Sequence, residues 1–424
     1  MSAQRPWSVH RLVRLLTLLG LLLASATAAS AVGGTVVARG LANPRGLVVA
    51  SDGTLYVSEA GSGGSDTFNG PPNFGPGPSH RGTSARVSRI GADGTATLVA
   101  GNLPSLALGG YEVIGPSTLV EVDGDLLVVT GYVHQAMAAA PNEAAVLRIN
   151  RTTGAVTLVS DIGAFERAND PDGFGIESDL NGIAASADGA VYVGDAGGNA
   201  LYRIDPRSGQ LSLVTVFDGL PGAGPNPARG NRNELDPVPT GVAMAADGSV
   251  YVGFLSGFPF PTGAAKVIRV ARDGAVSDAL TGLTAVVGVA VGPDGLLYVV
   301  EFASGFDLNA QPPGWKNDSG RVLRVLPTGA TQVVADGLNR PYGIAFDKTG
   351  NLFVTNHSDA PPEAGAQGEV VRFTAVAPPA VQVALPATGG DAGMRERLLI
   401  LLAGLALACS GLLVRGRRQA QRRS

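Results

Sequence analysis

A turn followed by a β-rich run occurs six times along the chain, and this repetition limits the fold more than any other feature. Each copy places Asp or Thr before a glycine and continues with a short run rich in Leu, Val and Tyr or Phe. The six copies are Asp52–Val57, Asp123–Val128, Asp188–Val193, Asp247–Val252, Asp294–Val299 and the more divergent Thr349–Val354. Asp-Gly favours the positive φ of a tight hairpin turn, and the run that follows favours a strand. A unit of this size cannot bury its own faces, so the repetition predicts an array or a propeller.

Each unit continues with further strands in the same order. A strand rich in Arg and Val comes next, as at Ala145–Ile149, and a second turn leads to a fourth strand, as at Ala155–Val159. Another strand precedes the first turn, as at Gly46–Val49. Four antiparallel strands in each of six units predict an all-β fold, a six-bladed β-propeller over residues 32–376. We expect an N-terminal strand at Thr35–Ala38 to close the ring by pairing into the last blade. The alternative is a sandwich of two sheets, which six equivalent copies disfavour.

Composition and charge limit the partners of this repeat region. Residues 32–388 contain 21 Lys and Arg against 33 Asp and Glu. Nucleic acid is excluded as a partner, because its phosphates need clustered basic residues. Cys409 is the one cysteine, which excludes a disulfide framework and a cysteine-based zinc site. Aromatic residues make up 5% of the chain, so we expect a core of Val, Leu, Ile and Ala.

The segment 1–31 has the features of a secretory signal peptide. It begins with basic residues, continues with an apolar run at Leu12–Leu23 and ends in small residues. The sequence Ala29-Ser30-Ala31 fits an A-x-A cleavage site, which places the cut between Ala31 and Val32. The alternative is an uncleaved membrane anchor, for which the apolar run is short.

The C-terminal part of the chain combines three elements. A linker over 377–397 contains the motif Leu385-Pro386-Ala387-Thr388-Gly389, a predicted transmembrane helix covers 398–414, and a basic tail covers 415–424. The apolar stretch just reaches the minimum length for crossing a bilayer, and the arginines after it favour a cytoplasmic tail. By itself this pattern predicts a single-span membrane anchor.

Together with the pentapeptide, these elements resemble an LPxTG cell-wall sorting signal. The resemblance implies that a sortase cuts between Thr388 and Gly389 and joins Thr388 to cell-wall peptidoglycan. The alternative is that the segment 398–414 stays in the membrane without processing. Under both interpretations the middle of the chain is extracellular, in the cell wall or at the outer face of the plasma membrane.

Loop lengths assign a working face to the predicted propeller. In a four-stranded antiparallel meander, the first and third turns lie on one face and the remaining connections lie on the other. Here the first and third turns are short, and the long connections are the remaining ones, for example 60–82, 163–180, 254–264 and 302–319. Long loops gathered on one face are where binding usually occurs.

The strand after the first turn ends in a polar residue in several units, at the expected mouth of the central channel. These candidate metal ligands are Glu59, Asp195, Glu301 and Asn356, with His357 beside the last. Their oxygens suit a single divalent cation such as Ca²⁺. The alternative is that they accept backbone N–H groups and close the loops. A further acidic cluster, Asn169–Gly173 with Glu177 and Asp179, lacks the regular ligand spacing of a calcium-binding loop.

Several segments resemble the ScyD/ScyE family of secreted propellers, which is related to NHL-repeat proteins. The segments that carry the resemblance are Gly40–Gly46, Phe165–Gly173, Asp195–Ala200, Val238–Gly241 and Leu255–Pro261. The similarity covers roughly residues 34–374, and Ile176–Gly182 departs from the family's pattern. It implies a six-bladed fold and a location outside the cell. It implies no known reaction, and it does not place this chain in pigment synthesis.

Candidate ligand contacts on the long-loop face come from several of these segments. They are Asn43, Arg45, Asp172, Asn199, Phe258, Phe260 and His357. The two phenylalanines suggest a platform for a ligand, and anchoring of their loop by burial is the alternative. The histidines of the middle part lie in separate long loops and no nucleophile motif precedes a helix, so we predict no catalytic residue.

Two classes of function follow from these observations. The first, which we prefer, is a non-enzymatic binding module that grips a protein, a glycan or a small molecule on its long-loop face. The second is a divalent-metal-dependent, lactonase-like hydrolase with its site at the mouth of the central channel. A tight cation at the acidic strand ends would favour the second. The fold alone does not choose between them.

Overall fold

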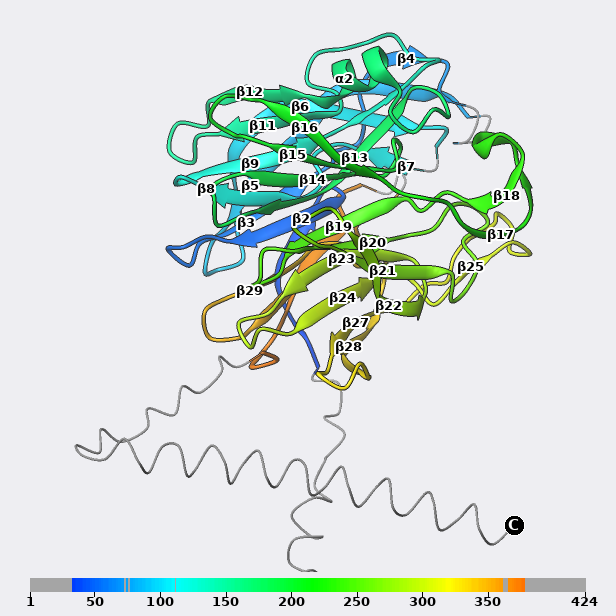
Figure 1. Cartoon of the computed structure of the whole chain (residues 1–424). Helices are drawn as coiled ribbons and strands as arrows, with labels where there is room; N and C mark the ends of the chain where they lie inside the picture. Colours follow the sequence, from blue (N-terminus) through cyan, green and yellow to red (C-terminus); the bar gives the residue numbers. More distant parts are fainter. Residues whose placement is uncertain (1–32, 72–73, 75–76, 111, 361–364, 378–424) are drawn as a thin grey trace, which may run out of the picture. The chain divides into compact units, whose positions relative to one another are not determined.

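Antiparallel strands form most of the regular structure of this chain, and they gather in six sheets of four or more strands (Figure 1). The fold is taken from a computed structural model. It describes residues 33–71, 74, 77–110, 112–360 and 365–377, all of which belong to the first of two compact units, the one that ends at Ala380.

Four strands that pair in order form the main part of each of the six sheets, and β4 (Asp66–Phe68), β7 (Glu112–Ile114) and β10 (Tyr132–His134) extend two of them. The first sheet contains β2 (Pro44–Val49), β3 (Leu55–Glu59), β5 (Ser79–Ile90) and β6 (Ala96–Leu108). The second contains β8 (Leu119–Val122), β9 (Asp125–Thr130), β11 (Ala145–Ile149) and β12 (Val156–Asp161). The third contains β13 (Glu177–Ala185), β14 (Val191–Asp195), β15 (Ala200–Ile204) and β16 (Leu211–Val216). The fourth contains β19 (Pro239–Met244), β20 (Val250–Phe254), β21 (Ala265–Val270) and β22 (Val276–Leu283). The fifth contains β23 (Val286–Val291), β24 (Leu297–Glu301), β27 (Gly320–Val325) and β28 (Thr331–Leu338). The sixth contains β29 (Ile344–Phe346), β30 (Leu352–Asn356), β31 (Gly368–Phe373) and β1 (Thr35–Leu41).

The first strands of these sheets contact one another in a closed cycle. Strand β2 contacts β8, and the contacts continue through β13, β19 and β23 to β29, which again contacts β2. The six largest clusters of buried apolar side chains lie between neighbouring sheets in the same cyclic order. A cycle of antiparallel sheets, each packed on the next, is the arrangement of a β-propeller.

The N-terminal strand completes the sixth sheet. Strand β1 pairs antiparallel with β31, with Thr35 opposite Arg372 and Leu41 opposite Gly368. The expected closure by an N-terminal strand is therefore confirmed, and this strand is longer than predicted. Because β29–β31 lie near the end of the described chain and β1 at its start, residues from both ends hold the last sheet together.

Glycine is required where the first strands approach one another most closely. A Cβ on Gly343 would collide with the carbonyl oxygen of Arg45, and a Cβ on Gly46 would collide with the backbone of Thr118. Gly182, Gly241 and Gly288 face the next strand in the same way. The backbones can cross this tightly only because the side chain is absent.

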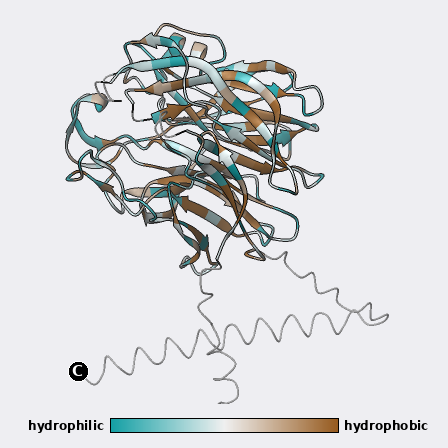
Figure 2. Cartoon of the chain, turned by 180° about the vertical axis from the view of Figure 1, so that it is seen from behind, coloured by the Kyte–Doolittle hydropathy of each residue, from teal (hydrophilic) through white to brown (hydrophobic). Residues whose placement is uncertain are grey.

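The core follows the strand pattern that the sequence predicts. Figure 2 shows apolar residues concentrated along the strands and polar residues concentrated in the connections. The aromatic side chains that are fully buried are few, and Val, Leu, Ile and Ala supply most of the buried apolar residues. Large exposed apolar side chains on the fourth strands occur singly, one on each of β6, β12, β16 and β22. They are Leu98, Leu158, Leu213 and Val276.

One segment differs from its prediction. The connection 163–180, predicted as a long loop, contains the helix α2 (Ile162–Asn169). The side chain of Asp161 accepts a hydrogen bond from the backbone N–H of Ala164 and caps the start of the helix. Asp170, in the left-handed conformation, ends it. The sequence therefore carried the capping signals of a helix that the repeat pattern did not include.

Several predictions concern residues that lie outside the described part of the chain. They are the signal peptide 1–31, the sorting motif 385–389, the transmembrane segment 398–414 and the basic tail 415–424. Among the residues that the structure does describe, none forms a helix long and apolar enough to cross a membrane.

Candidate functional site

Every additional element that the structure describes lies in the connections predicted to share one face. Strands β4 (Asp66–Phe68), β10 (Tyr132–His134), β25 (Phe306–Asp307) and β26 (Gly314–Trp315) lie between the second and third strands of their sheets. Strand β7 (Glu112–Ile114), helix α2, and the group β17 (Leu220–Asn226), η2 (Pro227–Arg229) and β18 (Arg232–Leu235) lie between one sheet and the next. In an antiparallel meander these two kinds of connection leave the same edge of the sheet. We call this side the long-loop face.

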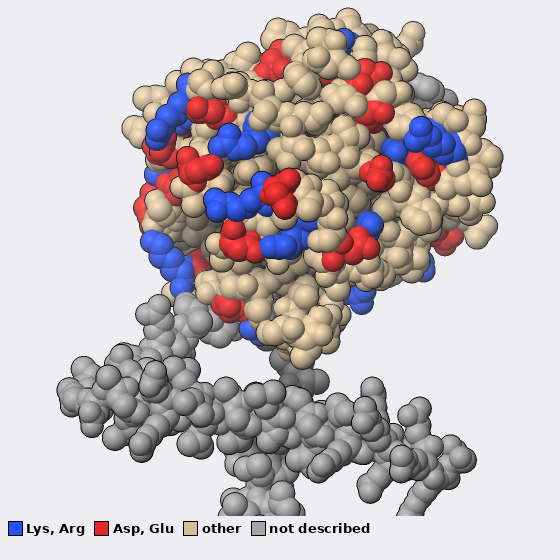
Figure 3. Space-filling model, in the orientation of Figure 1, with Lys and Arg blue, Asp and Glu red and all other residues tan. Residues whose placement is uncertain are grey.

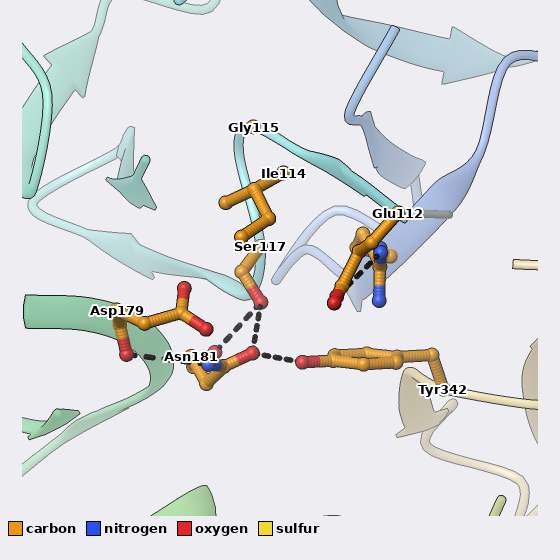
Figure 4. A pocket seen from close by; sticks show the side chains of 8 residues that line it. Glu112, Ile114, Gly115, Ser117, Asp179, Asn181 and Tyr342 are labelled. Atoms are coloured by element: carbon orange, nitrogen blue, oxygen red, sulfur yellow. Dashed lines mark hydrogen bonds and ion pairs between the residues drawn. The ribbon is translucent and has the colours of Figure 1, made fainter. Parts of the chain in front are cut away.

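A polar pocket lies where the first strands enter the ring from the long-loop face (Figure 4). Its polar lining comes from Arg45, Glu112, Ser117, Asp179, Asn181 and Tyr342. Arg45, Ser117, Asn181 and Tyr342 occupy equivalent positions in their sheets, at or just before the first strand. The first strand makes its close contact with the next sheet beside this position. The cavity has a volume of about 10 Å³, which is close to the space that one water molecule needs.

Tyr342 spans this pocket. Its hydroxyl donates a hydrogen bond to the side-chain oxygen of Asn181, which comes from β13, three places away around the cycle of first strands. Ser117 donates to the backbone oxygen of Asn181 at 3.0 Å. These bonds connect three sheets across the centre of the ring. The buried Tyr342 hydroxyl thus closes the centre on the long-loop side.

Arg45 supplies the positive charge of the pocket. Its guanidinium lies 4.8 Å from the centre of the Tyr342 ring and donates to the backbone oxygen of Val113 at 2.8 Å. Glu112 and Asp359 lie 3.5 Å and 3.9 Å away. Because carboxylates already surround Arg45, this pocket does not offer an anion a free positive charge.

The acidic groups of the pocket hold protons more tightly than usual. Burial raises the pKa of Glu112 to about 7, an effect that Arg45 partly offsets and that the charge of Asp359 increases. Burial, with the charges of Glu112 and Asp195, raises the pKa of Asp179 well above its ordinary value. Burial also raises the pKa of Tyr342 to about 12, so its hydroxyl stays a donor. Chemically, the pocket can hold a proton or one water molecule near neutral pH.

Glu59, a predicted metal ligand, caps its own sheet instead. It accepts hydrogen bonds from the backbone N–H of Ala42 at 2.8 Å and from the hydroxyl of Ser88 at 2.6 Å. The guanidinium of Arg86 donates to both carboxylate oxygens, at 2.8 Å each. The side chain is fully buried, and its two oxygens are held by Arg86 and Ser88 of β5 and by the backbone before β2.

Glu301 and Asn356 make the corresponding bonds in their sheets. Glu301 accepts from the backbone N–H of Thr284 at 2.7 Å and from Arg321, and Asn356 accepts from the backbone N–H of Asn339 at 2.8 Å. Among the described residues, no three Asp, Glu, His or Cys side chains come close enough to hold one metal ion. The four predicted ligands are therefore not brought together, and their bonds match the capping alternative.

Asp195, the remaining predicted ligand, lies in a buried acidic cluster. It accepts from the hydroxyl of Ser178 at 2.6 Å and from two backbone N–H groups. Burial raises the pKa of Asp195 to about 6. Burial, with the charges of Asp195 and Asp172, raises the pKa of Glu166 on α2 to about 8, and the backbone N–H of Glu177 offsets this only in part.

The predicted ligand contacts fall into three neighbourhoods of the long-loop face. In the first, the Asn43 side chain accepts from the backbone N–H of Ala360 at 2.7 Å, close to Arg45. His357 lines a cavity of about 170 Å³ there, together with Arg340. In the second, Asn199 donates to Asp172 at 2.9 Å. The third contains Phe258 and Phe260.

Phe258 and Phe260 belong to a cluster of aromatic rings on two long connections. Phe260 lies 4.7 Å from Trp315 and 5.3 Å from Phe306, measured between ring centres. Phe258 lies 5.8 Å from Phe260 and is 65% exposed. Buried Phe302 packs under Trp315 at 5.4 Å. We call Phe258, Phe260, Phe306 and Trp315 the aromatic platform. Phe260 is partly buried and anchors the loop, whereas Phe258 faces solvent.

Charges on the surface do not form a large region of one sign in the view of Figure 3. Basic and acidic side chains lie beside each other there. Among the pairs that the structure describes are Arg203 with Asp188 at 2.9 Å and Lys266 with Asp278 at 2.7 Å. This mixture gives no extended basic surface on the face shown.

The sequence analysis did not select Ser117, Asn181 and Tyr342, or Glu166. A signal for Asn181 and Tyr342 exists. Aligning the units at the start of the first strand places Arg45, Asn181 and Tyr342 directly before a glycine. The side chains at this position face the centre of the ring. Glu166 carried no comparable signal, since its helix belongs to a single unit.

Comparisons with known proteins give low similarity. No family model matches the chain, and no curated protein matches it. Among solved structures, a streptogramin B lyase is 13% identical, with 80% of this chain and 96% of that chain covered and a TM-score of 0.43. A gluconolactonase from Xanthomonas campestris is 16% identical, with 82% and 92% covered and a TM-score of 0.47. A calcium-binding protein, regucalcin, from Agrobacterium tumefaciens is 14% identical, with 81% and 93% covered and a TM-score of 0.46. The propeller assignment therefore rests on the strand pairing and the cyclic contacts of this chain.

Proposed function

We propose that this chain is a six-bladed propeller that acts as a non-enzymatic binding module through its long-loop face. Each of the six sheets is one blade. The observation that carries the proposal is the aromatic platform, in which the exposed Phe258 contacts the rings of Phe260 and Phe306, and both of these contact Trp315. Aromatic side chains dominate the energetics of binding surfaces, because they bury a large area at a low entropic cost. The single exposed apolar residues on the fourth strands form no such cluster.

The polar pocket at the centre of the ring supports binding over catalysis. Its cavity holds about one water molecule, and Tyr342 with Arg45 fills the centre of the ring. A cavity of this size leaves no room for a lactone-sized substrate, and the side chain of Glu112, which lines it, is 38% exposed. The aromatic platform, in contrast, is accessible as it stands.

We further propose that the chain works outside the cell. The signal peptide directs export, and the sorting motif leads to attachment of Thr388 to peptidoglycan by a sortase. A Thr388→Ala variant is then expected to move from the cell-wall fraction to the membrane fraction. Equal amounts of both proteins in the wall fraction would contradict sortase attachment.

A screen tests the binding proposal. The full chain and its Phe258→Ala variant are compared on arrays of glycans, cell-wall polysaccharides and peptides. Leu213→Ala, which removes an exposed apolar side chain on β16, serves as the control. We expect a ligand that binds the wild type and the control and is lost from Phe258→Ala. Ligands held equally by all three proteins would place the binding surface elsewhere and contradict the role of the platform.

A second candidate function is a lactonase-like hydrolase at the polar pocket. The observation in its favour is Glu112, whose pKa of about 7 suits a general acid or base near neutral pH. Hydrolysis of a lactone panel by the wild type, lost in Glu112→Gln and kept in Phe258→Ala, would favour this candidate over the binding module.

A further inference from the structure

A group of buried oxygen atoms without hydrogen-bond partners lies between α2 and the turn that joins β14 to β15. Within the described residues, both carboxylate oxygens of Glu166, the side-chain oxygen of Asn199 and the hydroxyl of Tyr202 make no hydrogen bond of normal geometry, although the backbone N–H of Glu177 lies close enough to Glu166 to favour its charged form. Glu166 and Tyr202 are fully buried, and Asn199 is 3% exposed. Buried polar atoms almost always have partners in native proteins, so several orphans in one place require an explanation.

These atoms share a location with Asp195. A Cβ placed on Gly198 would lie 3.0 Å from Oδ2 of Asp195 and 3.3 Å from Oε2 of Glu166, so the two carboxylates face the same glycine. The Tyr202 hydroxyl interacts electrostatically with both of these acids. The amide nitrogen of Asn199 donates to Asp172 at 2.9 Å, which leaves its oxygen as the unpaired end.

The part of the chain that the structure describes pairs no positive charge with the two carboxylates of this group. Among the described residues, neither Glu166 nor Asp195 forms an ion pair. The neighbouring Arg229 is held by Glu234 at 3.1 Å and Asp236 at 3.2 Å. Two buried carboxylates without a counter-charge are costly, so such a group either keeps a proton, as the raised pKa of Glu166 indicates for the metal-free state, or coordinates a metal.

We propose that a calcium ion occupies this position, held by the carboxylates of Glu166 and Asp195 and by the side-chain oxygens of Asn199 and Tyr202. Ca²⁺ takes oxygen ligands only and accepts irregular geometry, and its charge balances two carboxylates. Mg²⁺ suits the site less well, because it demands a regular octahedron and keeps several waters. A water molecule donates only two hydrogens and would leave part of the group unsatisfied.

This site goes beyond the proposed binding function and differs from the metal site predicted at the strand ends. Only two of its ligands are carboxylates, so it agrees with the absence of three-acid groups among the described residues. The ion would join α2 to the turn after β14 and so fix the loop that carries Asp172 on the long-loop face. The site therefore organises the face and does not take part in a reaction.

Metal content and thermal stability of the full chain test the proposal. The protein is saturated with Ca²⁺, desalted and measured by elemental mass spectrometry, and its melting temperature is recorded with Ca²⁺ and with a chelator. Terbium luminescence, excited through tyrosine, reports binding beside Tyr202. The variants are Glu166→Gln and the control Asp218→Asn, which changes the same charge at an exposed position.

We expect one calcium per chain in the wild type and in Asp218→Asn, with a higher melting temperature when Ca²⁺ is present. Glu166→Gln should bind Ca²⁺ at least about tenfold more weakly, while its metal-free form stays folded, because glutamine keeps the shape of the side chain and needs no counter-charge. The proposal is overturned if the wild type holds no calcium, or if its melting temperature is the same with Ca²⁺ and with the chelator. Calcium retained equally by Glu166→Gln also overturns it. Neither result depends on the aromatic platform, so the binding function is tested separately.

Discussion

Replacing Glu59 by Gln separates a capping role from a metal-binding role at the strand ends. Glu59 is fully buried and accepts four hydrogen bonds, two of them from Arg86. Glutamine keeps one acceptor oxygen but turns an N–H₂ group toward a donor, so at least one buried N–H loses its partner. Leaving such a group unsatisfied costs about 1–3 kcal/mol. The lost charge adds to this, but Arg86 is 39% exposed and regains water. We expect a net loss of about 2–3 kcal/mol in the free energy of unfolding.

The assay is urea unfolding of the wild type, Glu59→Gln and the control Asp218→Asn, each with Ca²⁺ and with a chelator. The capping role predicts that Glu59→Gln is less stable by the same amount in both conditions, with the stabilisation by Ca²⁺ unchanged. Asp218→Asn should match the wild type. Loss of the calcium response in Glu59→Gln, or an unchanged stability, would refute the reasoning.

Three further predictions concern the centre of the ring. Tyr342→Phe removes the hydroxyl that donates to Asn181. We expect the free energy of unfolding, measured by urea unfolding, to fall by about 1–2 kcal/mol. An unchanged free energy would show that the bond does not contribute to stability. Gly343→Ala forces a Cβ into the neighbouring backbone and should cost about 3 kcal/mol or more, whereas Gly224→Ala, where a Cβ meets open space, should have little effect on the melting temperature. The folded-state pKa of Glu112 is about 7, above its ordinary value of 4.5, so the folded state binds this proton more tightly and stability should fall as the pH rises from 4.5 to 7. Glu112→Gln should flatten this part of the pH profile, and an unchanged slope would contradict the assignment.

The strands could be predicted from the sequence because their signals are local. Strands β3, β14 and β24 end at Glu59, Asp195 and Glu301, where the sequence places their ends. An Asp-Gly turn precedes five of the six strands and a Thr-Gly turn precedes the sixth, and the glycine of each of these turns has a positive φ. Closure by β1 could be predicted because the strand at Thr35–Ala38 precedes the first full unit.

The candidate site was harder to predict because it depends on side-chain directions and on distant contacts. Glu59 lies at the predicted strand end, yet its carboxylate turns to Arg86 on the neighbouring strand, a choice that a strand pattern does not contain. Tyr342 and Asn181 are 161 positions apart and meet only because the ring closes. Glu166 lies on a helix inserted into one unit, so no repeat could reveal it.

The affinity of the aromatic platform for its ligand tests the central claim most directly. The dissociation constant of the tightest ligand from the screen is measured for the wild type, Phe258→Ala and Leu213→Ala. We predict binding at least about tenfold weaker in Phe258→Ala, with an unchanged melting temperature and with Leu213→Ala equal to the wild type. Equal dissociation constants for all three proteins would contradict the claim that this face is where the chain binds its partner.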